Sequence, residues 1–103
     1  MHGRAKHALD TLVVEARGLN TGQDQIYIYQ MLSRFAVRTL VVTACVGPAN
    51  YVPLCVENGV EELVLPAVNF AVADPPVPRG LHVLVGQLAT ERADELTTEF
   101  KFP

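Results

Sequence analysis

The sequence predicts an all-β domain, a jelly-roll or β-sandwich of short antiparallel strands, and three observations lead to this fold class. Apolar and polar residues alternate with period two in several short runs, which is the spacing of a half-buried strand. Turn-forming residues separate these runs at short intervals, as in sandwiches and barrels. The clearest turn signal, Asn58-Gly59, lies between two apolar runs and suits the positive-φ positions of a type I′ hairpin turn.

A β-hairpin is therefore expected over residues 51–73, and the rest of the chain would be organised around it. In its first arm, Val52, Leu54 and Val56 alternate with more polar neighbours. In the long second arm, Leu63 and Leu65 share a face with residue 61. The alternation thus predicts that both arms are strands, the second one long.

The other expected elements follow from the same two signals. Strands are predicted over residues 11–16, 38–46 and 81–88, and a short helix over 89–95. Residues 25–31 contain an Ile-Tyr-Ile-Tyr run whose β-propensity favours a strand, although a helix capped by Thr21 is the alternative. We expect a flexible lead-in over residues 1–10, the β domain over 11–90, and an acidic, exposed end over 91–103. The alternative fold is a small α/β domain with helices over 22–36 and 49–58.

Composition points to self-association. A chain of 103 residues is expected to form one domain, and half of its residues are apolar. No apolar run approaches the roughly 18 residues of a membrane helix, so no membrane contact is expected. A small monomer can bury only part of so many apolar side chains, so a homo-oligomer is predicted. The alternatives are a face covered by a ligand and a core that is simply rich in valine. The net charge of −3 argues against direct binding of nucleic acid.

No residue pattern predicts catalysis. Cys45 and Cys55 lie in apolar runs, which favours two buried thiols in a reducing, intracellular compartment over the alternative of a disulfide. The histidines lack metal-ligand spacing, and His82 lies inside an expected strand. Ser33, the only serine, has no Gly-x-Ser-x-Gly context, and no phosphate-binding glycine motif is present. We therefore expect no enzyme activity, no metal and no cofactor.

Acidic residues gather in two places, near the expected hairpin tip and near the C-terminal end. An ordinary solvated surface accounts for such clusters, whereas the functional alternative is an anionic face for a basic protein. Under this alternative the partner-binding residues are Glu57, Glu61, Glu62, Glu91, Asp94 and Glu95.

Several segments between residues 11 and 88 match a known strand pattern. They are Leu12-Val13-Val14-Glu15, Tyr51-Val52-Pro53-Leu54-Cys55, Asn58-Gly59, Glu61-Glu62, Leu65 to Phe70, and Leu81-His82-Val83-Leu84-Val85-Gly86. In this order they resemble the nucleoplasmin-like core domain, including the version at the N-terminus of some nuclear prolyl isomerases. The resemblance implies a nuclear, ring-shaped homopentamer that chaperones histones. The long acidic tracts of that family are absent here, which leaves a pure oligomerisation module as the alternative.

A second, shorter resemblance belongs to another class of protein. The run Val37-Arg38-Thr39-Leu40-Val41-Val42-Thr43, followed by Gly47 and Asn50, is similar to the phosphorolytic core strand of purine nucleoside phosphorylases. It covers fewer than about twenty residues and implies a nucleoside-binding α/β fragment. This is the alternative that accompanies the α/β fold.

Overall fold

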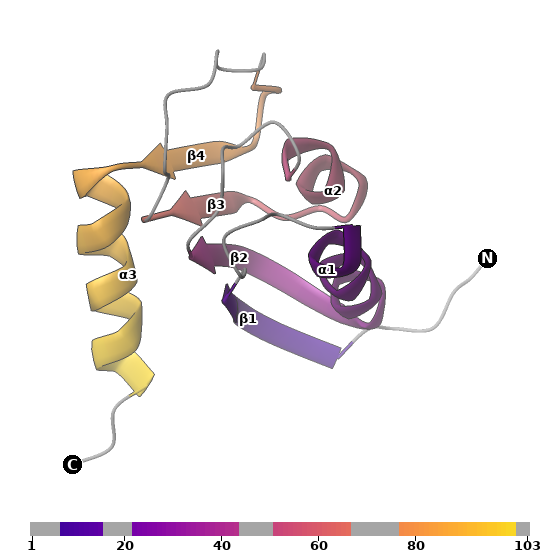
Figure 1. Ribbon diagram of the computed structural model, residues 1–103, viewed down its shortest axis with the longest axis horizontal. Helices are drawn as coiled ribbons and strands as arrows, with labels where there is room; N and C mark the ends of the chain where they lie inside the picture. The colour runs from indigo at the N-terminus through magenta and orange to yellow at the C-terminus, as the bar shows by residue number, and fades with distance from the viewer. Residues whose placement is uncertain (1–6, 16–21, 44–50, 67–76, 101–103) are drawn as a thin grey trace.

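The computed structural model describes residues 7–15, 22–43, 51–66 and 77–100, which form a four-stranded, all-parallel sheet with strand order β1-β2-β3-β4 (Figure 1). The elements are β1 (His7–Glu15), α1 (Gly22–Arg34), β2 (Phe35–Thr43), α2 (Val52–Glu57), β3 (Glu62–Leu65), β4 (His82–Val85) and α3 (Gln87–Phe100). The fold is a small α/β fold. The prediction of an antiparallel jelly-roll or β-sandwich is therefore wrong, and its α/β alternative is right.

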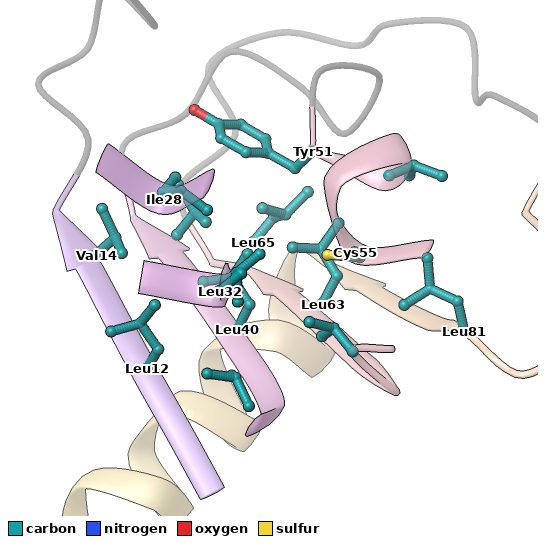
Figure 2. Close-up of a cluster of buried hydrophobic side chains, with 14 residues drawn as sticks. Leu12, Val14, Ile28, Leu32, Leu40, Tyr51, Cys55, Leu63, Leu65 and Leu81 are labelled. Carbon is teal, nitrogen blue, oxygen red and sulfur yellow. The ribbon is translucent and has the colours of Figure 1, made fainter. Parts of the chain in front are cut away.

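Helices cover the sheet from both sides, with α1 and α2 on one face and α3 on the other (Figure 1, Figure 2). The larger apolar cluster joins α1 and α2 to the strands through side chains such as Ile28, Cys55 and Leu63. A smaller cluster joins α3 to Val41 and Val64 on the opposite face. Buried parallel strands are apolar on both faces, so period two disappears where the sheet is covered twice. In β3, successive residues 63, 64 and 65 are all fully buried.

Residues 25–31, expected as a strand, lie in α1. Ile28 and Leu32 are four residues apart, so both point from one side of the helix into the core (Figure 2). Ile26 and Tyr27 remain exposed, although the strand prediction counted them as part of the alternating run. β-propensity reflects packing on a pleated surface, and the apolar spacing of four available here overrides it.

The expected hairpin turn at Asn58-Gly59 is instead the C-terminal cap of α2. Gly59 has a φ of 71°, the left-handed conformation common just after a helix. Val60 N–H donates to the carbonyl of Cys55 at 3.0 Å, and Gly59 N–H donates to that of Val56 at 3.4 Å. These two bonds form a Schellman motif. Asn-Gly supplies positive φ equally well for a hairpin turn and a helix cap, so the dipeptide alone does not distinguish them.

For most of the remaining elements, the predicted type agrees with the structure, but the boundaries differ. The strands expected over 11–16, 38–46 and 81–88 are found as β1, β2 and β4, and the helix expected over 89–95 lies within α3. The second hairpin arm is reduced to β3, with Pro66 directly after its end, and residues 67–76 lie outside the described part of the chain. The first arm, 52–57, is α2, and Pro53 suits its first turn, where a backbone N–H has no helical acceptor.

Candidate functional site

The six acids expected to bind a basic partner do not form one site. Glu57 ends α2, and Glu61 lies at the amino edge of the sheet, where it pairs with Arg38 at 3.5 Å. Glu91 and Asp94 lie on α3, which covers the opposite face of the sheet from α2 (Figure 1). The structure therefore separates the acids into two groups on different layers.

Glu62 and Glu95 are already bound to a cation of the same chain. Arg92 Nε lies 3.0 Å from Glu62 Oε2, its Nη2 lies 3.1 Å from Oε1, and its Nη1 lies 3.3 Å from Glu95 Oε2. Thr39, a buried residue of β2, donates its hydroxyl to Glu62 Oε1 at 2.9 Å. A basic partner would have to compete with Arg92 for both carboxylates.

This Thr39–Glu62–Arg92 cluster fastens α3 to the sheet and sets the protonation of its members. Burial alone would raise the pKa of Glu62, but hydrogen bonds from Arg92 and Thr39, with the charge of Arg92, hold it below its usual range. The hydrogen bond to Glu62 likewise raises the pKa of Arg92. Both groups stay charged at neutral pH, so the cluster is suited to holding a helix in place rather than to proton transfer.

The described histidine, cysteine and acidic side chains are poorly placed for metal binding or nucleophilic catalysis. Within the described residues, no group of three histidine, cysteine or acidic side chains is placed to hold a metal ion. Cys55 is fully buried, and its burial raises the pKa of the thiol to about 12. A thiol with so little thiolate at neutral pH is a poor nucleophile. Cys45 lies outside the described residues.

The Cys55 thiol is expected to resist labelling by an aromatic disulfide reagent at pH 7–8 in the folded protein. In a Cys45→Ser variant, which removes the other thiol, colour should develop only after denaturant is added, because unfolding restores an ordinary thiol pKa. Rapid, stoichiometric labelling without denaturant would contradict the placement of Cys55 on the buried side of α2.

Two shallow hollows adjoin Gly59 and Glu61 at the amino edge of the sheet, and neither has the form of a ligand pocket. Their volumes are about 190 and 200 Å³, and exposed Arg79 and Arg38 lie on their rims. Pockets that enclose small ligands usually measure about 300–1,000 Å³. Parallel sheets normally bind ligands at the opposite, carboxyl edge. Here the segments after β1, β2 and β3, with Gly47 and Asn50 of the phosphorylase resemblance, lie outside the described residues.

Exposed apolar side chains among the described residues are most numerous on β1 and α1, where Val13 lies on the α3 face of the sheet and α1 covers the other face. Eight large apolar side chains are exposed in the described part of the chain, and four of them belong to these two elements. Val13 is 60% exposed, Ile26 58%, Tyr27 49% and Tyr29 51%. We call these four residues the β1–α1 edge. Sequence reasoning missed it because the α1 residues were assigned to a strand, whereas a helical assignment places Ile26 outside when Ile28 and Leu32 are inside.

Comparison with protein-family models, curated protein sequences and solved structures finds no match. The nucleoplasmin-like resemblance therefore consists only of the residues quoted above, and the jelly-roll it implies is not the fold of this chain. Without that fold, the pentamer has no structural basis here, while histone binding and nuclear location stay predictions. No helix among the described residues is long and apolar enough to cross a membrane.

Proposed function

We propose that this domain is a self-association module rather than an enzyme, and that copies of it join through the β1–α1 edge. The proposal rests on the composition of the solvent-facing side of α1. From Gln25 to Ser33 the helix contains no charged residue, yet Ile26, Tyr27 and Tyr29 are all about half exposed. Surface helices normally place charged and polar residues on their solvent side. Protein interfaces are depleted in charge at their centre and enriched in tyrosine.

The charge distribution favours a second copy as the occupant of this surface. The chain carries a net charge of −3, so two copies repel one another at most orientations. Exposed Glu91, Asp94 and Glu95 place negative charge on α3, on the opposite side of the sheet from α1. Over residues 25–33 of α1, two copies can approach without bringing like charges together. Because residues 25–33 of α1 contain no carboxylate, this surface does not favour a cationic partner.

Replacing Ile26 with glutamate is expected to raise the dissociation constant of the assembly by about ten- to a hundredfold. This range corresponds to about 1.4–2.7 kcal/mol, the loss found for a well-packed interface residue. Glutamate is a better helix former than isoleucine, so the fold should be retained. Sedimentation equilibrium over a micromolar concentration series measures the constant, and far-UV circular dichroism checks the fold.

Leu88→Glu is the matched control, because Leu88 is also an exposed apolar residue of a helix, at 64%, but lies on α3. This variant should associate as the wild type does. Raising the salt concentration should leave wild-type association unchanged or strengthen it, because the contact is apolar. A wild type that stays monomeric throughout the series, or equal losses from both variants, would contradict the proposal.

A further inference from the structure

β1 has an outer edge that no strand of the described chain pairs with, and the acidic side chains on this strand are Asp10 and Glu15. β1 runs for nine residues without proline, glycine or lysine. The opposite edge strand, β4, has only four residues and lies between Gly80 and Gly86, both with positive φ. Long, unbroken edges are templates for pairing with another strand, whereas short or interrupted ones are protected. Of the two edges of this sheet, the one at β1 is therefore suited to strand addition.

On the α3 face of the sheet, apolar side chains of adjacent strands form a row, and the last member of this row, on β1, is exposed to solvent. The strand register places Val13 beside Val41, Val41 beside Val64, and Val64 beside Leu84. Side chains of α3 pack on the last three members, and Val41 and Val64 are almost completely buried. Val13 is 60% exposed although it continues the same row. The row is thus incomplete at β1.

We infer that β1 pairs antiparallel with β1 of a second copy, with Val13 opposite its own counterpart on a two-fold axis. This pairing rests on the proposed self-association and specifies its geometry. The two sheets would form one continuous sheet of eight strands, and the apolar row would run across both copies. A two-fold axis perpendicular to the sheet makes the interface isologous, so the chain meets its own complementary surface and the assembly closes as a dimer.

The Val13-centred register suits the neighbouring residues as well. It places Thr11 opposite Glu15 of the second copy, and these two residues share a face with Val13. A threonine–glutamate contact of this kind already exists between adjacent strands of the chain, where Thr39 donates to Glu62 at 2.9 Å. Leu12 and Val14, both buried by the helix layer, would then lie opposite one another.

A register one residue away is disfavoured on two counts. It would place Val13 opposite Leu12, and directly opposed residues of an antiparallel pair point to the same side. The second copy would therefore be turned over, and its α1–α2 face would adjoin the α3 face of the first. It would also place Asp10 opposite Glu15, and like charges directly across a strand pair are destabilising. Of these two registers, the side chains of β1 favour the one centred on Val13.

The test uses Val13→Cys in the Cys45→Ser background, with Leu88→Cys as the matched control. Opposed residues in an antiparallel pair have Cβ atoms about 4.5–5.5 Å apart, close enough for a disulfide after a small adjustment. Mild oxidation at micromolar concentration should convert most of the Val13→Cys chains to a disulfide-linked dimer. The Leu88→Cys control, equally exposed, should stay mainly monomeric on a non-reducing gel.

A second variant, Val13→Lys, provides an independent measurement in the uncross-linked protein. Two lysines would oppose one another at the two-fold axis, so the dissociation constant should rise at least tenfold. If the wild type forms a dimer that Ile26→Glu weakens, but Val13→Lys leaves its affinity unchanged and Val13→Cys does not cross-link, β1 pairing is wrong and self-association stands. If the wild type is monomeric, both proposals fall.

Discussion

Replacing Leu63 with alanine is expected to lower the free energy of unfolding by about 2–5 kcal/mol, the range for truncating a buried leucine. Leu63 is fully buried between β3 and α2 (Figure 2). Its neighbour Val64 is also fully buried, but on the opposite face, beneath α3. Val64→Ala should therefore be clearly destabilising too, by somewhat less because it removes fewer carbon atoms. Urea denaturation followed by circular dichroism measures both changes.

This pair of variants distinguishes the observed fold from the one that the sequence predicts. In an antiparallel hairpin, residues 63 and 64 would face opposite sides and only one of them would be buried. In a parallel sheet covered on both faces, both substitutions are costly. Leu88→Ala, at an exposed position, should change stability by no more than about 0.5 kcal/mol and serves as the reference. A Val64→Ala variant as stable as this reference would contradict the placement of α3.

Glu62→Gln is expected to lower the free energy of unfolding by about 1–3 kcal/mol at pH 7, because it removes charge-assisted hydrogen bonds from Arg92 and leaves that cation less well paired. The folded protein holds the pKa of Glu62 below its usual range, so the carboxylate stabilises the fold above the unfolded pKa of about 4.3. That contribution is lost as the pH falls through the folded pKa. The difference between wild type and variant should therefore shrink below about pH 4.

Glu61→Gln is the matched control for this experiment. Glu61 precedes Glu62 directly and also pairs with an arginine, but the Arg38–Glu61 pair is mostly exposed and its atoms are 3.5 Å apart. Surface pairs of this kind contribute about 0–1 kcal/mol. Chemical denaturation at pH 7 and at pH 3.5 provides the four free-energy differences required. Equal effects of the two substitutions at pH 7 would show that the Thr39–Glu62–Arg92 cluster does not fasten α3.

The sequence was sufficient where the apolar pattern had one interpretation. The runs in β1 and β2 are rich in valine and leucine and were recognised as strands, with boundaries displaced by a few residues. Residues 25–31 and 52–57 carry patterns that a strand and a helix both satisfy over a short length. In both, a buried pair at helical spacing settles the structure: Ile28 with Leu32, and Val52 with Cys55. That burial depends on the rest of the fold and is absent from local propensity.

Site prediction failed for a related reason. The acids were grouped because they are close in sequence, yet the fold directs Glu61 to the sheet edge and Glu62 to Arg92, thirty residues away. In the sequence nothing distinguishes Val13 from the other residues of its strand. The strand register shows that Val13 lies beside the buried Val41. The outward position of Tyr29 required a helix that the sequence analysis disfavoured. Each case depends on tertiary neighbours, which a one-dimensional pattern does not contain.

Isotope-filtered NMR on a mixture of labelled and unlabelled protein can detect the proposed pairing of two copies at β1. Only contacts between copies give signals in this experiment. The two-fold arrangement predicts intermolecular cross-peaks between Val13 and Val13 of the second copy, and between Thr11 and Glu15. A dimeric sample whose intermolecular cross-peaks arise elsewhere, with none from β1, would contradict the claim.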